Sequence, residues 1–100
     1  MMTFPLNLSD EERQKVLGML NRLPLSCSSQ RIWAELRKAL VAHQGEFSFN
    51  EAGLLQEPQE IFSITNCALD LSNSCTGPVS ILFALINVEF QALTGSGTIL

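Results

Sequence analysis

Charge, and the side chains that usually carry chemistry, are scarce in this 100-residue chain. Only 16% of its residues are Asp, Glu, Lys or Arg, against about 25% in a typical soluble domain. It has no tyrosine, one tryptophan and one histidine. The net charge of −4 argues against general nucleic-acid binding, which depends on cationic contacts to phosphates. So few charges also predict that some apolar surface stays exposed for another protein to cover.

Cysteine is present but in no recognisable framework. Cys27, Cys67 and Cys75 form no C-x-x-C pair, and their number is odd. We therefore expect three free thiols in a reducing compartment, each behaving as a small, half-buried apolar residue. The first residues contain no basic stretch before an apolar run, so no signal peptide is expected. Together these features predict a cytoplasmic protein.

The most apolar stretch of the chain, residues 79–93, is too short to cross a membrane. It runs for about 15 residues and is interrupted by Asn87 and Glu89, whereas a span needs about 20 apolar residues. Thr76 can cap a helix here, Pro78 can start it and Gly95 can stop it. We therefore expect a helix inside a helical bundle and no membrane partner.

Both sides of this helix are apolar, which is typical of a central position in a bundle. We expect Phe83, Ile86 and Phe90 to be buried. The opposite side, formed by Ile81, Leu85 and Val88, has two possible fates: it packs under residues 46–57, or it is left for a partner. Only the second would give the helix a function.

Three further helices are expected, over residues 9–23, 28–45 and 58–75. The first begins with a capping box, Ser9 with Glu12. Residues 46–57 are interpreted as a loop with one helical turn, because "FSF" has no obvious strand partner. The sequence thus predicts an all-α fold, a compact antiparallel bundle of four main helices plus one or two short ones. Residues 1–95 form one domain, and 96–100 begin a linker to a further C-terminal region.

No arrangement of residues predicts catalysis. His43 has no second histidine or paired carboxylate at motif spacing, so it is interpreted as a partly buried structural residue. One histidine and three scattered cysteines do not match a tetrahedral metal site. Trp33 and Arg37, four positions apart, are expected to stack on one helix. We therefore expect a non-enzymatic protein with no metal and no cofactor.

Charge is segregated along the chain. Six basic and four acidic residues give the first 38 positions a charge of +2, and six acids without a base give the remainder −6. Ordinary solvated helix faces explain this pattern as well as a bipolar docking module does. Under the second interpretation the basic face comprises Arg22, Arg31, Arg37 and Lys38. The acidic face comprises Glu51, Glu57, Glu60 and Asp70.

The order of these features resembles the effector-associated domains of bacteria, which are small, helical, death-like domains. The residues that carry the resemblance are Ser9 to Glu12, Leu23, Pro24, Arg31, Leu36, Leu40, Ile64, Asn66, Gly77, Leu82, Leu85, Asn87, Leu93, Gly95 and Ser96. The resemblance implies a death-domain-like adaptor without catalytic residues. Such a domain pairs with a related helical domain, or with itself, and recruits a protease, a TIR protein or an ATPase-linked effector in bacterial signalling or defence.

A second function class stays open from the residues alone. A small, acidic, helical chain also suits an inhibitor or immunity-type protein that binds a target of unrelated fold. The gene beyond Leu100 separates the two classes, because an adaptor is expected to continue into an effector or sensor region.

Overall fold

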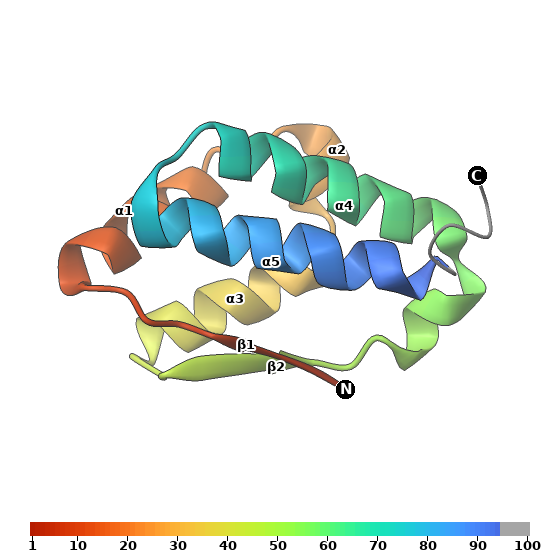
Figure 1. Ribbon diagram of the computed structural model, residues 1–100, viewed down its shortest axis with the longest axis horizontal. Coiled ribbons are helices and arrows are strands. Elements are labelled where there is room, and N and C mark those ends of the chain that lie inside the picture. The colour runs from red at the N-terminus through yellow and green to blue at the C-terminus, as the bar shows by residue number, and fades with distance from the viewer. Residues whose placement is uncertain (95–100) are drawn as a thin grey trace.

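The computed structural model describes residues 1–94, which form a mainly helical fold with a small two-stranded sheet (Figure 1). The elements in chain order are β1 (Met2–Pro5), α1 (Asp10–Leu20), α2 (Leu25–Ser28), α3 (Arg31–Val41), β2 (Glu46–Phe49), the 3-10 helix η1 (Ala52–Gln56), α4 (Pro58–Asn73) and α5 (Gly77–Leu93). Four long helices and two short ones confirm the predicted helical bundle. The expected stop at Gly95 and the linker at 96–100 lie outside the described residues.

The helices α4 and α5 form an antiparallel hairpin along the long axis of the molecule (Figure 1). The hydroxyls of Ser72 and Ser80 lie 3.2 Å apart, and the Asn87 side chain donates to the Thr65 carbonyl at 2.8 Å. These two contacts fix how the helices face each other. Phe83, Ile86 and Phe90 of α5 are buried, as predicted.

A second layer, made of α3 and the two strands, completes the core. Along α3 the buried stripe predicted from the sequence is confirmed for Ile32, Trp33, Leu36 and Leu40. The Trp33 indole packs against Phe83, with ring centroids 6.1 Å apart, and its N–H donates to the Gln30 amide oxygen at 2.7 Å. The tryptophan is thus held by Phe83 of α5 and by the residue that precedes its own helix.

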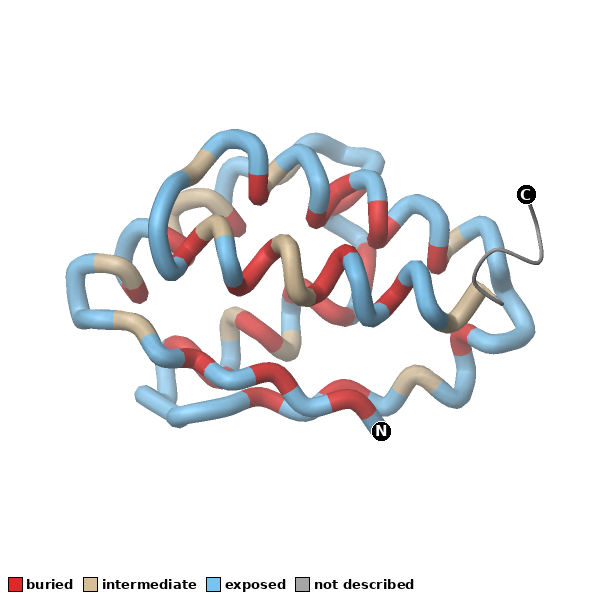
Figure 2. The backbone as a smooth tube through the Cα atoms, in the orientation of Figure 1, coloured by how far each residue is buried: buried red, intermediate tan, exposed pale blue. Residues whose placement is uncertain are grey.

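The strand pair is a correction to the loop predicted over residues 46–57. β2 pairs with β1 in antiparallel register, Phe4 opposite Phe47, and exposure alternates along both strands (Figure 2). Phe4 stacks on Phe47 at 5.1 Å and on Phe90 at 6.5 Å. The partner of "FSF" is thus the first few residues of the chain. So short a strand, ending in proline, carries little signal of its own.

The cysteines are the second correction. Cys27 and Cys67 form a buried disulfide that joins α2 to α4 across 40 residues of chain. The odd number of cysteines was misleading, because two can pair and leave one over. Cys75 is the free thiol, half-buried, with its sulfur 3.4 Å from the Met19 sulfur.

The ends of α1 and α3 follow from their local sequence. The Ser9–Glu12 capping box is confirmed, with the two hydrogen bonds at 3.1 and 2.8 Å. At the end of α3, the amides of His43 and Gln44 donate back to the carbonyls of Leu40 and Ala39, which is the Schellman pattern. His43 takes the left-handed position with φ of 55° and is exposed. Its predicted partial burial, and the predicted extension of α3 to Gly45, are therefore wrong.

Candidate interaction surface

Two of the four residues of the predicted basic face, Arg31 and Arg37, contact other parts of the domain. The Arg37 guanidinium donates to the Leu20 carbonyl at 3.2 Å and is partly buried. The Arg31 guanidinium lies over the Phe49 ring, 5.0 Å from its centroid. Arg37 binds the end of α1 in place of the expected stacking on Trp33. Arg37 thus has a contact within the domain, whereas the Arg31 side chain contacts Phe49 and stays exposed.

The other two basic residues, Lys38 and Arg22, are exposed. Lys38 lies 3.6 Å from Glu35, one turn away on α3. Arg22 follows α1, where its guanidinium lies over Gly18. Three of the four cations thus lie on α3, and Arg22 lies just after α1. Arg22, Arg31 and Lys38 are exposed, while Arg37 is partly buried.

Sequence reasoning missed the structural role of Arg13. Only 8% of this residue is exposed, and its guanidinium donates to the Gln44 carbonyl at 2.9 Å. Arg13 of α1 therefore holds the chain just after α3, while Arg37 of α3 holds the last residue of α1. Position 13 is in phase with Val16 and Leu20 on the buried side of α1. Helical spacing therefore marks the position as buried, although an arginine there does not suggest it.

The predicted acidic residues are also dispersed. Glu57 and Glu60 lie at the start of α4, while Asp70 is about 15 Å further along the same helix, at 1.5 Å per residue. Glu51 lies apart from all three and pairs with the N-terminal ammonium at 3.1 Å. A backbone hydrogen bond, assisted by this ammonium, holds the pKa of Glu51 below its usual value. The structure thus brings Glu57 and Glu60 together at the beginning of α4 and places Asp70 near its other end.

A different surface emerges from the exposed apolar side chains. We call it the α4–α5 face and define it by Phe62 and Leu69 on α4 and Ile81 and Val88 on α5. Their exposed fractions are 43%, 44%, 68% and 57%. Each pair is seven residues apart, close to two helical turns, so both members lie on one side of their helix.

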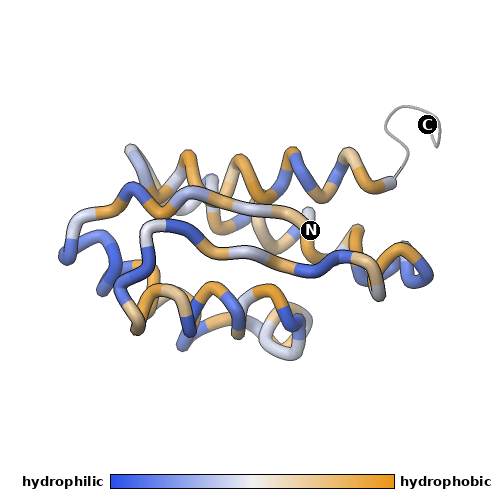
Figure 3. Tube along the Cα trace, turned by 90° about the horizontal axis from the view of Figure 1, so that it is seen from below, coloured by the Kyte–Doolittle hydropathy of each residue, from blue (hydrophilic) through white to orange (hydrophobic). Residues whose placement is uncertain are grey.

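The packing of the hairpin joins the two pairs into one surface. Because Ser72 faces Ser80 and Thr65 faces Asn87, the antiparallel register sets Leu69 level with Phe83, and the next residue of α5, Ala84, is partly exposed. It likewise sets Phe62 level with Phe90, and the next residue, Gln91, is exposed. Leu85 and Ala92 continue the stripe on α5, where hydrophobic residues recur along its outer side (Figure 3). The side formed by Ile81, Leu85 and Val88 is thus left outside the core.

The α4–α5 face is uncharged at its centre. Asp70 and Glu89 are the nearest acids, and the 100° turn per residue places each on the outer margin of its helix, away from the seam between α4 and α5. Neither Lys nor Arg occurs after position 38 of the sequence. The face therefore suits an apolar partner surface better than a charged one.

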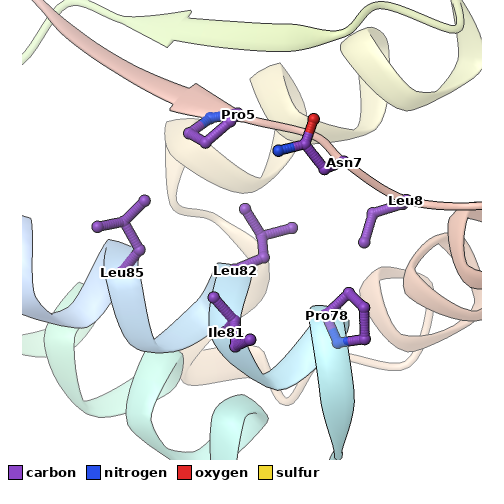
Figure 4. Close-up of a pocket in the computed structure, with 7 residues that line it drawn as sticks. All are labelled: Pro5, Asn7, Leu8, Pro78, Ile81, Leu82 and Leu85. Atoms are coloured by element: carbon purple, nitrogen blue, oxygen red, sulfur yellow. The ribbon is translucent and has the colours of Figure 1, made fainter.

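A pocket adjoins this face at the beginning of α5 (Figure 4). Its volume is about 250 Å³, and it opens between the chain that leads from β1 to α1 and the first turns of α5. Six apolar side chains and the Asn7 amide line it. Ile81 and Leu85 belong both to the pocket and to the exposed stripe, so pocket and face form one continuous surface.

Within residues 1–94, no three His, Cys, Asp or Glu side chains gather closely enough to hold a metal ion. None of the helices in that range is long and apolar enough to cross a membrane. With the geometry established, comparison with known proteins adds no relative: no family model, curated protein or solved structure matches this chain.

Proposed function

We propose that this chain is a non-catalytic protein-interaction module and that the α4–α5 face is its binding surface. The single observation that carries the proposal is the exposure of Ile81 and Val88 on the most apolar helix of the domain. Leaving such side chains in water costs free energy that burial by a partner would recover, at about 25 cal/mol per Å². The largest apolar patch on a small domain, about 300–600 Å² in area, is often a functional surface.

The resemblance to effector-associated domains suggests which partner to seek. In this proposal the partner is another helical domain of related type, attached to a sensor or to an effector such as a protease. The uncharged centre of the face supports contact between two apolar helix pairs. The predicted basic and acidic residues do not border the centre of the face, so we do not propose that a basic face docks on an acidic one. In this proposal charge only steers the encounter, and apolar contact supplies the affinity.

The disulfide bears on where such a module works. The expected cytoplasmic location rested partly on three free thiols, and the Cys27–Cys67 bond removes that ground. Structural disulfides are typical of oxidising compartments, so we propose that the domain folds in one. Thiols are alkylated in intact cells, and the number of alkylated cysteines is then counted from the mass of the protein by mass spectrometry. One alkylated cysteine supports an oxidising compartment, and three alkylated cysteines would indicate a reducing one.

A matched pair of substitutions tests the proposed function. Val88 lies on the α4–α5 face and Val41 on α3, and their exposed fractions are 57% and 64%. A partner captured by the wild-type domain is purified and titrated against Val88→Asp and Val41→Asp. We expect Val88→Asp to weaken binding at least tenfold and Val41→Asp to leave it unchanged. Equal affinity of both variants would refute this binding surface.

A further inference from the structure

We infer that the α4–α5 face can be covered by the same face of a second copy of this chain, giving an isologous homodimer. The inference rests on the proposed function, since it names one partner for the proposed surface. In a two-fold symmetric dimer the same patch of both copies is in contact, so the residues at its centre must pack against identical residues without charge repulsion. Charge, area and helix geometry each bear on whether it does.

Charge permits the pairing. A surface rich in one sign repels its own copy, whereas the α4–α5 face carries its two acids, Asp70 and Glu89, on opposite margins. The centre, formed by Leu69, Ala84 and Val88, holds no ionisable group. A second copy can therefore exclude water from the centre of the face without burying a charge. Burying an acid there would be costly unless a basic residue paired with it, and neither α4 nor α5 contains a Lys or Arg.

Area permits a modest affinity. With about 200 Å² for a large apolar side chain, the exposed parts of the four defining side chains amount to about 400 Å². A standard stable interface takes about 800 Å² from each partner. Leu85, Ala92 and the walls of the adjoining pocket supply part of the remainder. The pair is thus expected to form at micromolar or higher concentration.

The shape of the helices permits close approach. Along α5, Ile81, Leu85, Val88 and Ala92 recur at spacings of four, three and four, which is the pattern of a helix seam. Ala84 and Ala92 are small and alternate with the larger side chains, so a facing helix can interlock with the stripe. Two α4–α5 hairpins packed face to face would form two layers of two helices each.

The sign of the salt dependence separates this partner from a basic one. Each copy carries a net charge of −4, so two copies repel at low ionic strength, and salt screens that repulsion beyond about 8 Å at 0.15 M. Pairing with a second copy should therefore strengthen as salt rises. Docking of a basic partner on the acidic part of the chain would weaken instead.

Sedimentation equilibrium of the purified 100-residue chain tests the inference. The wild type is measured from about 10 μM to 1 mM at low and moderate salt, beside Val88→Asp and Val41→Asp. We expect a concentration-dependent dimer that strengthens with salt. Because the substituted position occurs twice in the pair, Val88→Asp should raise the dissociation constant at least tenfold, while Val41→Asp leaves it unchanged.

Dilution of the ¹⁵N-labelled wild type keeps the test decisive even where Val88→Asp fails to fold. Amide shifts that change on dilution should cluster on α4 and α5, between positions 62–69 and 81–92. A wild type that sediments as one chain at every concentration overturns the inference, as do dilution shifts confined to α1 and α3. A monomer that still binds another protein through Val88 would overturn the homodimer alone, and the proposed function would stand.

Discussion

His43→Gly is expected to stabilise the domain, because a side chain occupies a backbone position that suits glycine. His43 has φ of 55° at the end of α3, where the Schellman pattern places a left-handed residue. That conformation costs a residue with a Cβ about 1–2 kcal/mol. Glycine also makes the unfolded chain more flexible, which stabilises the unfolded state and offsets about 0.4–1 kcal/mol of the strain relieved. The net expectation is about 0.5–1 kcal/mol of added stability.

Urea and thermal unfolding followed by circular dichroism measure the effect. For a domain of this size 1 kcal/mol corresponds to about 4–8 °C in Tm, so the increase should be readily seen. His43→Ala keeps the left-handed strain and should gain nothing. Ala42→Gly, at φ of −83° one residue earlier, should lose up to about 1 kcal/mol. If His43→Gly were no more stable than His43→Ala, the strain argument would be refuted.

Three further predictions concern the contacts that hold the domain together. Cys67→Ser should lower the free energy of unfolding by about 4 kcal/mol, the chain-entropy value for a loop of 40 residues, and an unchanged urea midpoint would contradict this. Arg37→Ala should cost about 1–2 kcal/mol through the lost bond to a carbonyl, while Lys38→Ala, on an exposed side chain, should cost under about 0.5 kcal/mol; equal losses would exclude the internal role. The lowered pKa of Glu51 means that its carboxylate adds stability above the usual value of 4.5, which is lost as pH falls through the lower folded value. Unfolding measured from pH 6 to pH 2.5 should therefore depend less on pH in Glu51→Gln than in Glu57→Gln.

The parts of the fold that were predictable from the sequence are those set by neighbouring residues. Ser9 and Glu12 lie three positions apart and cap α1 whatever the rest of the chain does. Pro78 and the run after it likewise mark α5. The strand pair was missed because Phe4 and Phe47 meet only in three dimensions, and a four-residue strand carries little pattern of its own.

The interaction surface was half-predictable for a similar reason. Because α5 is apolar on both sides, one side is expected to contact something other than the core. Periodicity alone does not show which side that is. Periodicity alone places Phe62 and Leu69 beside the buried stripe of their helix, and only the packing of Ser72 against Ser80 shows that they join the exposed side of α5. The contacts of the predicted basic residues could not be read from the sequence, because the carbonyl that Arg37 binds and the ring that Arg31 covers come from distant parts of the chain.

The pairing of β1 with β2 also dictates when the domain can finish folding. During synthesis the first strand leaves the ribosome early, yet its partner around Phe49 is made 45 or so residues later. Phe4 then packs on Phe90, which is among the last residues of α5 to appear. The N-terminal strand must therefore wait, unpaired and apolar, until nearly the whole chain is available. Closure of this core is a late event, and a nascent chain halted before α5 would present Phe4 to chaperones instead of to its own last helix.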